Sequence, residues 1–134
     1  MKLFVFLYLS LMAGVSLFLF QDKQLAESME RGSEIYADFC ITCHLAKGEG
    51  VEGVFPPLAN SDYLRNNREK SIIGIKNGQR GPITVNGVAY DNTMMPMGLT
   101  DDEVADVMNY ISNSWGNKND KIVTPEEVIL LTKK

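Results

Sequence analysis

The chain has 134 residues, a formal net charge of −4 and 45% hydrophobic residues, so it has room for one modest domain. An acidic chain of this kind is a poor match for nucleic acid and for anionic lipid surfaces. Its charge is compatible instead with docking to a positively charged patch on a protein partner. We therefore expect protein partners and no nucleic acid.

The first 20 residues are strongly apolar. Lys2 is their only charged residue, and residues 3–20 form one uncharged run. As a helix this run would be roughly 27 Å long, close to the thickness of a bilayer core. A cleavable signal peptide is the alternative, but its best cleavage site, residues 14–16, would leave the apolar residues 17–20 at the new N-terminus. The pattern favours a membrane anchor, and either interpretation exports the rest of the chain.

Residues 21–27 are predicted to form a short polar linker, and residues 28–134 a single domain. A helical pattern runs from Glu27 to about Thr42 and places Gly32 on one face with Tyr36 and Cys40. A glycine inside a helix costs about 0.5 to 1 kcal/mol relative to alanine, so it usually has a packing reason.

The motif Cys40-Ile41-Thr42-Cys43-His44 contains both cysteines and the only histidine of the chain. The pattern C-x-x-C-H is typical of a site for covalent attachment of a c-type haem. Each thiol adds across one haem vinyl group to give a thioether, and the histidine that follows lies under the iron as an axial ligand.

Two other interpretations of this motif are weaker. A thioredoxin-like redox pair expects a βαβ setting and a low-pKa thiolate, and no strand is predicted before Cys40. A structural zinc site needs four ligands, and no cysteine or histidine remains to complete one.

The rest of the chain predicts several short elements. Residues 47–58 are rich in glycine and proline and predict a loop. Residues 62–68 and 68–76 predict two short helices, the second apolar enough to form a wall. Asn-Gly between β-branched residues predicts a type I′ hairpin at residues 83–90. Thr100 and Glu103 form a capping box for the last main helix, which Gly116 ends, and Thr124 with Pro125 begins a final short helix.

Taken together, these features resemble class I cytochromes c, the small monohaem electron-transfer proteins, over roughly residues 28–130. The likeness rests on the attachment motif, the segment Phe55-Pro56-Pro57-Leu58, the loop Met94-Met95-Pro96-Met97-Gly98-Leu99 and the helix ending in Asn113-Ser114-Trp115-Gly116-Asn117. The resemblance implies an all-α cytochrome c fold, with three to five helices around a covalently bound haem and one small hairpin near residues 83–90. It also implies that the first helix crosses the last at Gly32, opposite Tyr110.

The axial ligands follow in part from this resemblance. A single histidine excludes a bis-histidine haem within one protomer, so a methionine thioether is the expected sixth ligand. Outside the N-terminal segment and the predicted helices, the candidates are Met94, Met95 and Met97. The spacing found in related cytochromes favours Met94 as the sixth ligand. Met95 is the alternative because it directly precedes a proline, and Met97 is a third. The resemblance further implies that the carbonyl of Pro56, or of Pro57, accepts a hydrogen bond from His44.

The expected function is that of a single-electron carrier with one covalent haem c, bound by Cys40 and Cys43 and ligated by His44 and Met94. With both axial positions filled, we expect no enzyme activity. The expected donor is a quinol-oxidising complex or a dehydrogenase, and the expected acceptor a terminal oxidase or reductase, on the periplasmic side of a bacterial inner membrane. A five-coordinate haem enzyme of peroxidase type and a haem-based ligand sensor are the alternatives.

Overall fold

The computed structural model describes residues 2–119 and 121–133, although most side chains of residues 2–19 lie outside this description. The elements follow in the order α1 (Lys2–Phe39), α2 (Ile41–His44), α3 (Asp62–Asn66), α4 (Arg68–Asn77), β1 (Ile83–Val85), β2 (Val88–Tyr90), α5 (Asp101–Ile111) and α6 (Pro125–Thr132). The fold class is helical with one small hairpin, as predicted. The described residues contain six helices and not three to five, because a break at Cys40 separates the single turn α2 from α1.

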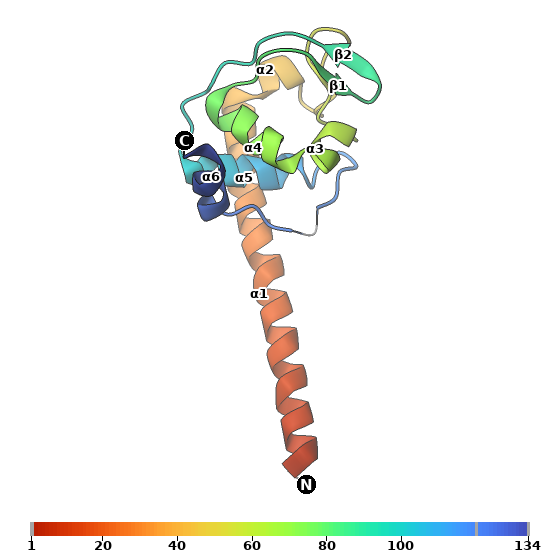
Figure 1. Ribbon diagram of the computed structural model, residues 1–134. Helices are drawn as coiled ribbons and strands as arrows, with labels where there is room; N and C mark the ends of the chain where they lie inside the picture. Colours follow the sequence, from red (N-terminus) through yellow and green to blue (C-terminus); the bar gives the residue numbers. More distant parts are fainter. Residues whose placement is uncertain (1, 120, 134) are drawn as a thin grey trace.

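Helix α1 projects from the domain as a long stalk that ends at the N-terminus (Figure 1). The predicted helix start near Glu27 is wrong, and residues 21–27 are helical. This stretch contains no glycine or proline, and an ion pair of 3.6 Å between Lys23 and Glu27 joins successive turns. Two helical segments separated by so few helix-compatible residues continue as one helix, because propagation costs less than a new nucleus.

In the part of the chain that the structure describes, no helix combines the length and the apolar character that a membrane crossing requires. The sequence-based prediction of an anchor or signal peptide at residues 1–20 depends largely on side chains outside the described residues.

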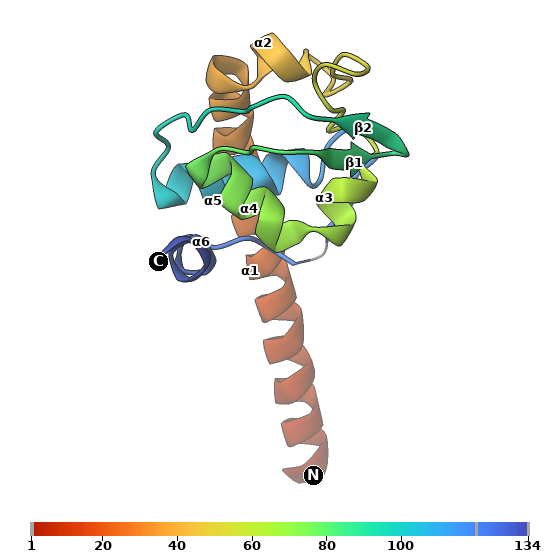
Figure 2. The ribbon, with the colours of Figure 1, turned by 45° about the horizontal axis from the view of Figure 1, so that its top comes forward.

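The crossing of α1 and α5 forms the centre of the domain (Figure 2). A side chain at Gly32 would overlap the carbonyl oxygen of Asp106 and would lie 2.8 Å from the Cβ atom of Tyr110. The predicted contact between Gly32 and Tyr110 is therefore confirmed, because only a glycine lets the two backbones approach this closely.

Apolar side chains on both sides of this crossing form one core. Ile72 of α4, Val104 and Met108 of α5 and Val128 of α6 are fully buried, so α4 and α6 pack on the same centre. The buried core comprises Tyr36, Leu64, Ile72, Leu99, Val104, Ala105, Val107, Met108, Ile111, Val123 and Val128.

Local signals at the element ends act as the sequence predicts. The Thr100 hydroxyl accepts from the Glu103 backbone N–H and the Glu103 carboxylate accepts from the Thr100 backbone N–H, which completes the capping box of α5. The strands β1 and β2 pair antiparallel, with φ of 51° at Asn86 and 81° at Gly87, as a type I′ turn requires. One predicted end is wrong, because helix α5 ends at Ile111 with Ser112 as its C-cap, a few residues before Gly116.

Candidate functional site

The motif predicted to attach haem lies on α2, at the end of the domain farthest from the N-terminus (Figures 1 and 2). The backbone N–H groups of Cys43 and His44 both donate to the carbonyl of Cys40, at 3.2 and 2.9 Å. This single turn brings the two thiols and the imidazole onto one short, closed segment. Because the turn follows α1 without a loop, α1 determines where these three side chains lie.

The imidazole of His44 is held by the loop that follows it. Its Nδ1 atom lies 2.9 Å from the carbonyl oxygen of Pro56, the contact that the resemblance implied. A carbonyl only accepts, so Nδ1 carries the proton and donates, which leaves the lone pair of Nε2 available for a metal. Burial lowers the pKa of His44, while the hydrogen bond to Pro56 opposes that shift. The ring is thus kept neutral, as an axial ligand requires.

The loop itself is fixed back onto the motif. The backbone N–H of Gly50 donates to the carbonyl of His44 at 3.0 Å, and the hydroxyl of Tyr36 donates to the carbonyl of Leu45 at 2.7 Å. Tyr36 also packs against Trp115, with ring centroids 4.9 Å apart. These contacts hold the imidazole and its acceptor in register with each other.

The thiols themselves have an environment that disfavours a redox dithiol. Both cysteines are free and partly buried, and burial raises the pKa of Cys40 to about 11, with a smaller contribution from Cys43. A dithiol of thioredoxin type needs a thiolate of low pKa. Among the residues that the structure describes, no group of three or more metal-binding side chains forms a zinc-like cluster.

The three candidate methionines differ in exposure and in backbone support. Met94 is partly buried, whereas Met95 is 54% exposed and Met97 is 38% exposed. Met94 alone of the three forms a pair of backbone hydrogen bonds, donating to and accepting from Gln79 at 2.9 Å each way. A side chain at Gly78, whose φ is +85°, would lie 2.8 Å from the Met94 carbonyl oxygen. The chain is therefore closely packed and fixed at Met94.

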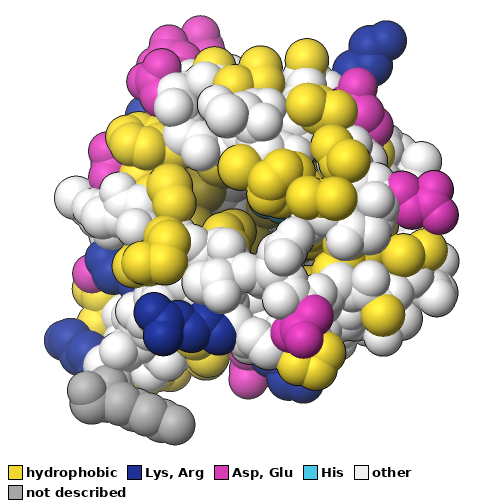
Figure 3. All heavy atoms as spheres, turned by 90° about the horizontal axis from the view of Figure 1, so that it is seen from above, with side chains coloured by type: hydrophobic (Ala, Val, Ile, Leu, Met, Phe, Trp, Pro, Cys, Tyr) yellow, Lys and Arg dark blue, Asp and Glu magenta, His cyan; other side chains and the backbone are white. Residues whose placement is uncertain are grey.

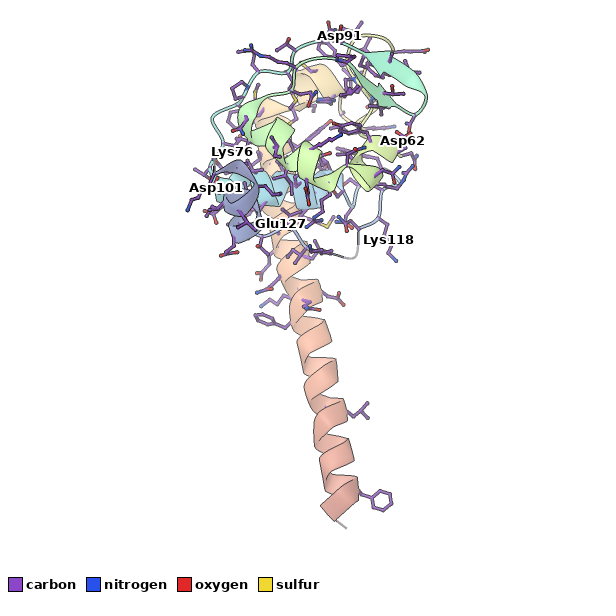
Figure 4. The ribbon with its side chains drawn as sticks, in the orientation of Figure 1. Asp62, Lys76, Asp91, Asp101, Lys118 and Glu127 are labelled. Atoms are coloured by element: carbon purple, nitrogen blue, oxygen red, sulfur yellow. The ribbon has the colours of Figure 1, made fainter. Side chains whose placement is uncertain are left out.

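Two further contacts hold the methionine loop against the rest of the domain. Lys76 of α4 donates to the carbonyl of Leu99 at 2.8 Å and pairs with Asp101 at 2.8 Å, side by side in Figure 4. At the other end of the loop, the amide of Asn92 donates to the carbonyl of Val54 at 2.9 Å. Sequence reasoning missed Gln79, Lys76 and Asn92, since no local pattern marks polar residues whose partners are distant in sequence.

Large hydrophobic side chains gather around a hollow at this end of the molecule (Figure 3). Leu45, Val51 and Val54, from the loop after His44, are 36–41% exposed, and Met95 and Met97 lie in the methionine loop. An apolar group inserted beside them would cover surface that otherwise faces water. The thiols, the neutral imidazole and the apolar surroundings fit a haem.

A helical domain with these features at one end defines a c-type haem protein. The family model described as cytochrome c matches residues 29–115. The chain belongs to the cytochrome c family, and the group that it binds covalently is accordingly haem c, with its iron. The resemblance stated from the sequence is thereby confirmed.

Two kinds of relative stand out among the similar proteins. A cytochrome c-552 of Thermus thermophilus is 38% identical over 113 residues, which cover 78% of this chain and 76% of that protein. The cytochrome c subunit of a quinone alcohol dehydrogenase from Gluconacetobacter polyoxogenes is 32% identical over 103 residues. The cytochrome c subunit of gluconate 2-dehydrogenase from Pantoea cypripedii is 31% identical over 122 residues. These last two matches cover 75% and 84% of this chain but only 22% and 28% of the two subunits.

Proposed function

We propose that this chain carries single electrons between respiratory redox partners, with one haem c attached through Cys40 and Cys43 and ligated by His44 and Met94. The observation that carries the proposal is the hydrogen bond from His44 to Pro56 within the C-x-x-C-H turn, because it leaves Nε2 as a ready axial ligand. When bound, haem supplies an iron that changes between the ferric and ferrous states.

The protein residues have separate tasks in this proposal. Cys40 and Cys43 fix the cofactor at the end of α1, and the Pro56 carbonyl orients the imidazole and increases its donation. A thioether from Met94 favours the ferrous state and so raises the reduction potential. With His44 and Met94 both holding the iron, no open position would be left for a substrate, so the chain would act as a carrier and would catalyse no reaction on its own.

Two alanine variants test the sixth ligand. Methionine ligation gives ferric cytochromes a weak long-wavelength absorption band, which we expect to disappear in Met94→Ala and to persist in Met95→Ala. Met95 is the matched control because it is the neighbouring side chain with the same chemistry. Survival of the band in Met94→Ala would refute the assignment. Colourless protein with two free thiols, from cells able to attach haem, would refute the carrier function itself.

The relatives that are dehydrogenase subunits suggest the donor. We propose a quinol-oxidising complex or a dehydrogenase as donor and a terminal oxidase or reductase as acceptor. The site of action is the periplasmic side of a bacterial inner membrane.

The uncharged residues 3–20 and the exposed Phe4, Leu11 and Phe20 support a membrane anchor formed by residues 1–20, with secretion after cleavage as the alternative. The mass of the mature protein distinguishes the two. A mass that lacks the N-terminal segment would contradict the anchor.

A further inference from the structure

The long helix α1 joins two parts of the chain that are expected to lie in different surroundings. Its N-terminal part contains the uncharged residues 3–20, and its C-terminal part crosses α5 and ends one residue before Cys40. Between Gly14 and Gly32 it contains no glycine or proline, and residues 21–24 are exposed. The helix thus crosses from the apolar segment to the haem-attachment motif without a hinge.

A cluster of polar side chains fixes α1 to the domain near the point where it leaves the surface. The carboxylate of Asp106 on α5 accepts from the hydroxyl of Ser28 at 2.6 Å, and from Nε and Nη2 of Arg31 at 2.6 and 2.8 Å. The amide of Asn109 donates to the Ser28 hydroxyl at 2.9 Å. Ser28 is only 4% exposed, so this cluster lies just inside the surface. Any swing of α1 against the domain would break bidentate, charge-assisted hydrogen bonds.

The rise per residue of an α-helix gives the distance that α1 covers between the apolar segment and the haem-attachment motif. From Gln21 to Phe39 the helix extends over about 29 Å, at 1.5 Å per residue. Figure 4 shows Lys118 on the side of the domain that faces the stalk, and Asp91 at the opposite end. The attachment turn α2 lies at that opposite end in both ribbon views.

We propose that α1 is a rigid spacer that holds the haem-attachment end of the domain about 29 Å beyond the apolar segment and directed away from it. This inference rests on the proposed function, namely a haem at Cys40 and Cys43 and an anchor at residues 1–20. It deepens that function by specifying the partner. The partner is a protein whose electron-exchanging group stands in an extramembrane domain at this height, with an apolar patch that faces Leu45, Val51 and Met95.

The height can be measured without the partner. The full-length holoprotein is reconstituted into neutral phosphatidylcholine vesicles that carry a fluorescent headgroup, and energy transfer from that headgroup to haem is recorded. Two variants bracket the wild type. In one, residues 21–25 are replaced by Gly-Ser-Gly-Ser-Gly, which keeps the length and removes the rigidity. In the other, seven helix-forming residues are inserted after Lys23. This insertion leaves the domain in nearly the same rotation about the helix axis relative to the apolar segment.

We expect weak transfer in the wild type. The flexible variant should transfer at least about twofold more efficiently, because a Gly/Ser linker lets the domain reach the surface. The insertion should lower transfer by about twofold or more, because it adds roughly 10 Å of helix. The haem absorption spectrum and the circular dichroism of each variant verify that the domain itself is unchanged.

The outcomes separate this inference from the proposed function. Equal transfer in the wild type and the flexible variant, with all proteins sedimenting with the vesicles, would overturn the rigid spacer alone. Failure of the wild type to sediment with the vesicles would overturn the anchor, and the inference with it. Absence of covalent haem would overturn the carrier function before any transfer is measured.

Discussion

Replacing Gly32 by alanine tests the helix crossing on which the site depends. The new Cβ atom would overlap the carbonyl oxygen of Asp106 and would approach the Tyr110 Cβ to 2.8 Å. The first of these contacts is with backbone, which cannot rotate away, so α1 and α5 must separate. Overpacking of this kind costs about 1–3 kcal/mol. Alanine is also a better helix former than glycine, which offsets about 0.5–1 kcal/mol of this cost. We expect a net loss of about 1–2 kcal/mol, and a fall in Tm of roughly 4–9 °C.

The matched control is Ala37→Gly, at an exposed position of the same helix. It changes helix propensity without touching α5 and should cost about 0.5–1 kcal/mol. Urea unfolding of the full-length holoproteins, followed by far-ultraviolet circular dichroism, gives both free energies. If Gly32→Ala is more stable than the wild type by the amount that the control loses, the crossing does not require glycine and the reasoning is wrong.

Three further predictions concern contacts that hold the domain around the site. The Arg68 guanidinium lowers the pKa of Glu127, so the stabilisation by this pair is complete above the unfolded pKa of about 4.3. This stabilisation is lost as the pH falls through the lower pKa that Glu127 has in the folded protein. In acid unfolding measurements, the free energy of unfolding of Glu127→Gln should therefore depend less steeply on pH in this range than that of the wild type. Thr100→Ala removes a cap and should cost about 1 kcal/mol in urea unfolding. Tyr36→Phe removes the hydrogen bond to Leu45 and should cost about 0.5–1.5 kcal/mol, read as a lower thermal midpoint; an unchanged midpoint would contradict the contact.

Features encoded within a few residues were predictable. The hairpin around Asn86, the capping box at Thr100 and the final helix after Thr124 are confirmed because each depends on side chains next to the backbone that they shape. The helix start near Glu27 was mispredicted because the polar residues before it are equally compatible with a helix once helices exist on both sides.

The candidate site likewise contains residues that the local sequence predicts and others that only the tertiary structure supports. Its cysteines and histidine could be found from spacing alone, because C-x-x-C-H is a local chemical pattern. The spacing found in related cytochromes already favoured Met94 over Met95, and the tertiary structure adds the backbone pairing with Gln79 and the difference in exposure. Neither is a property of the methionine segment by itself.

The sequence by itself determined the attachment chemistry, the helical class and the ends of most elements, since these depend on neighbours along the chain. Only the tertiary structure decided where these parts meet. The close contact at Gly32, the Pro56 carbonyl at His44 and the cluster around Asp106 each join segments separated in sequence. Such contacts form when the whole core is buried, because hydrophobic burial brings distant segments together without regard to their order in the chain.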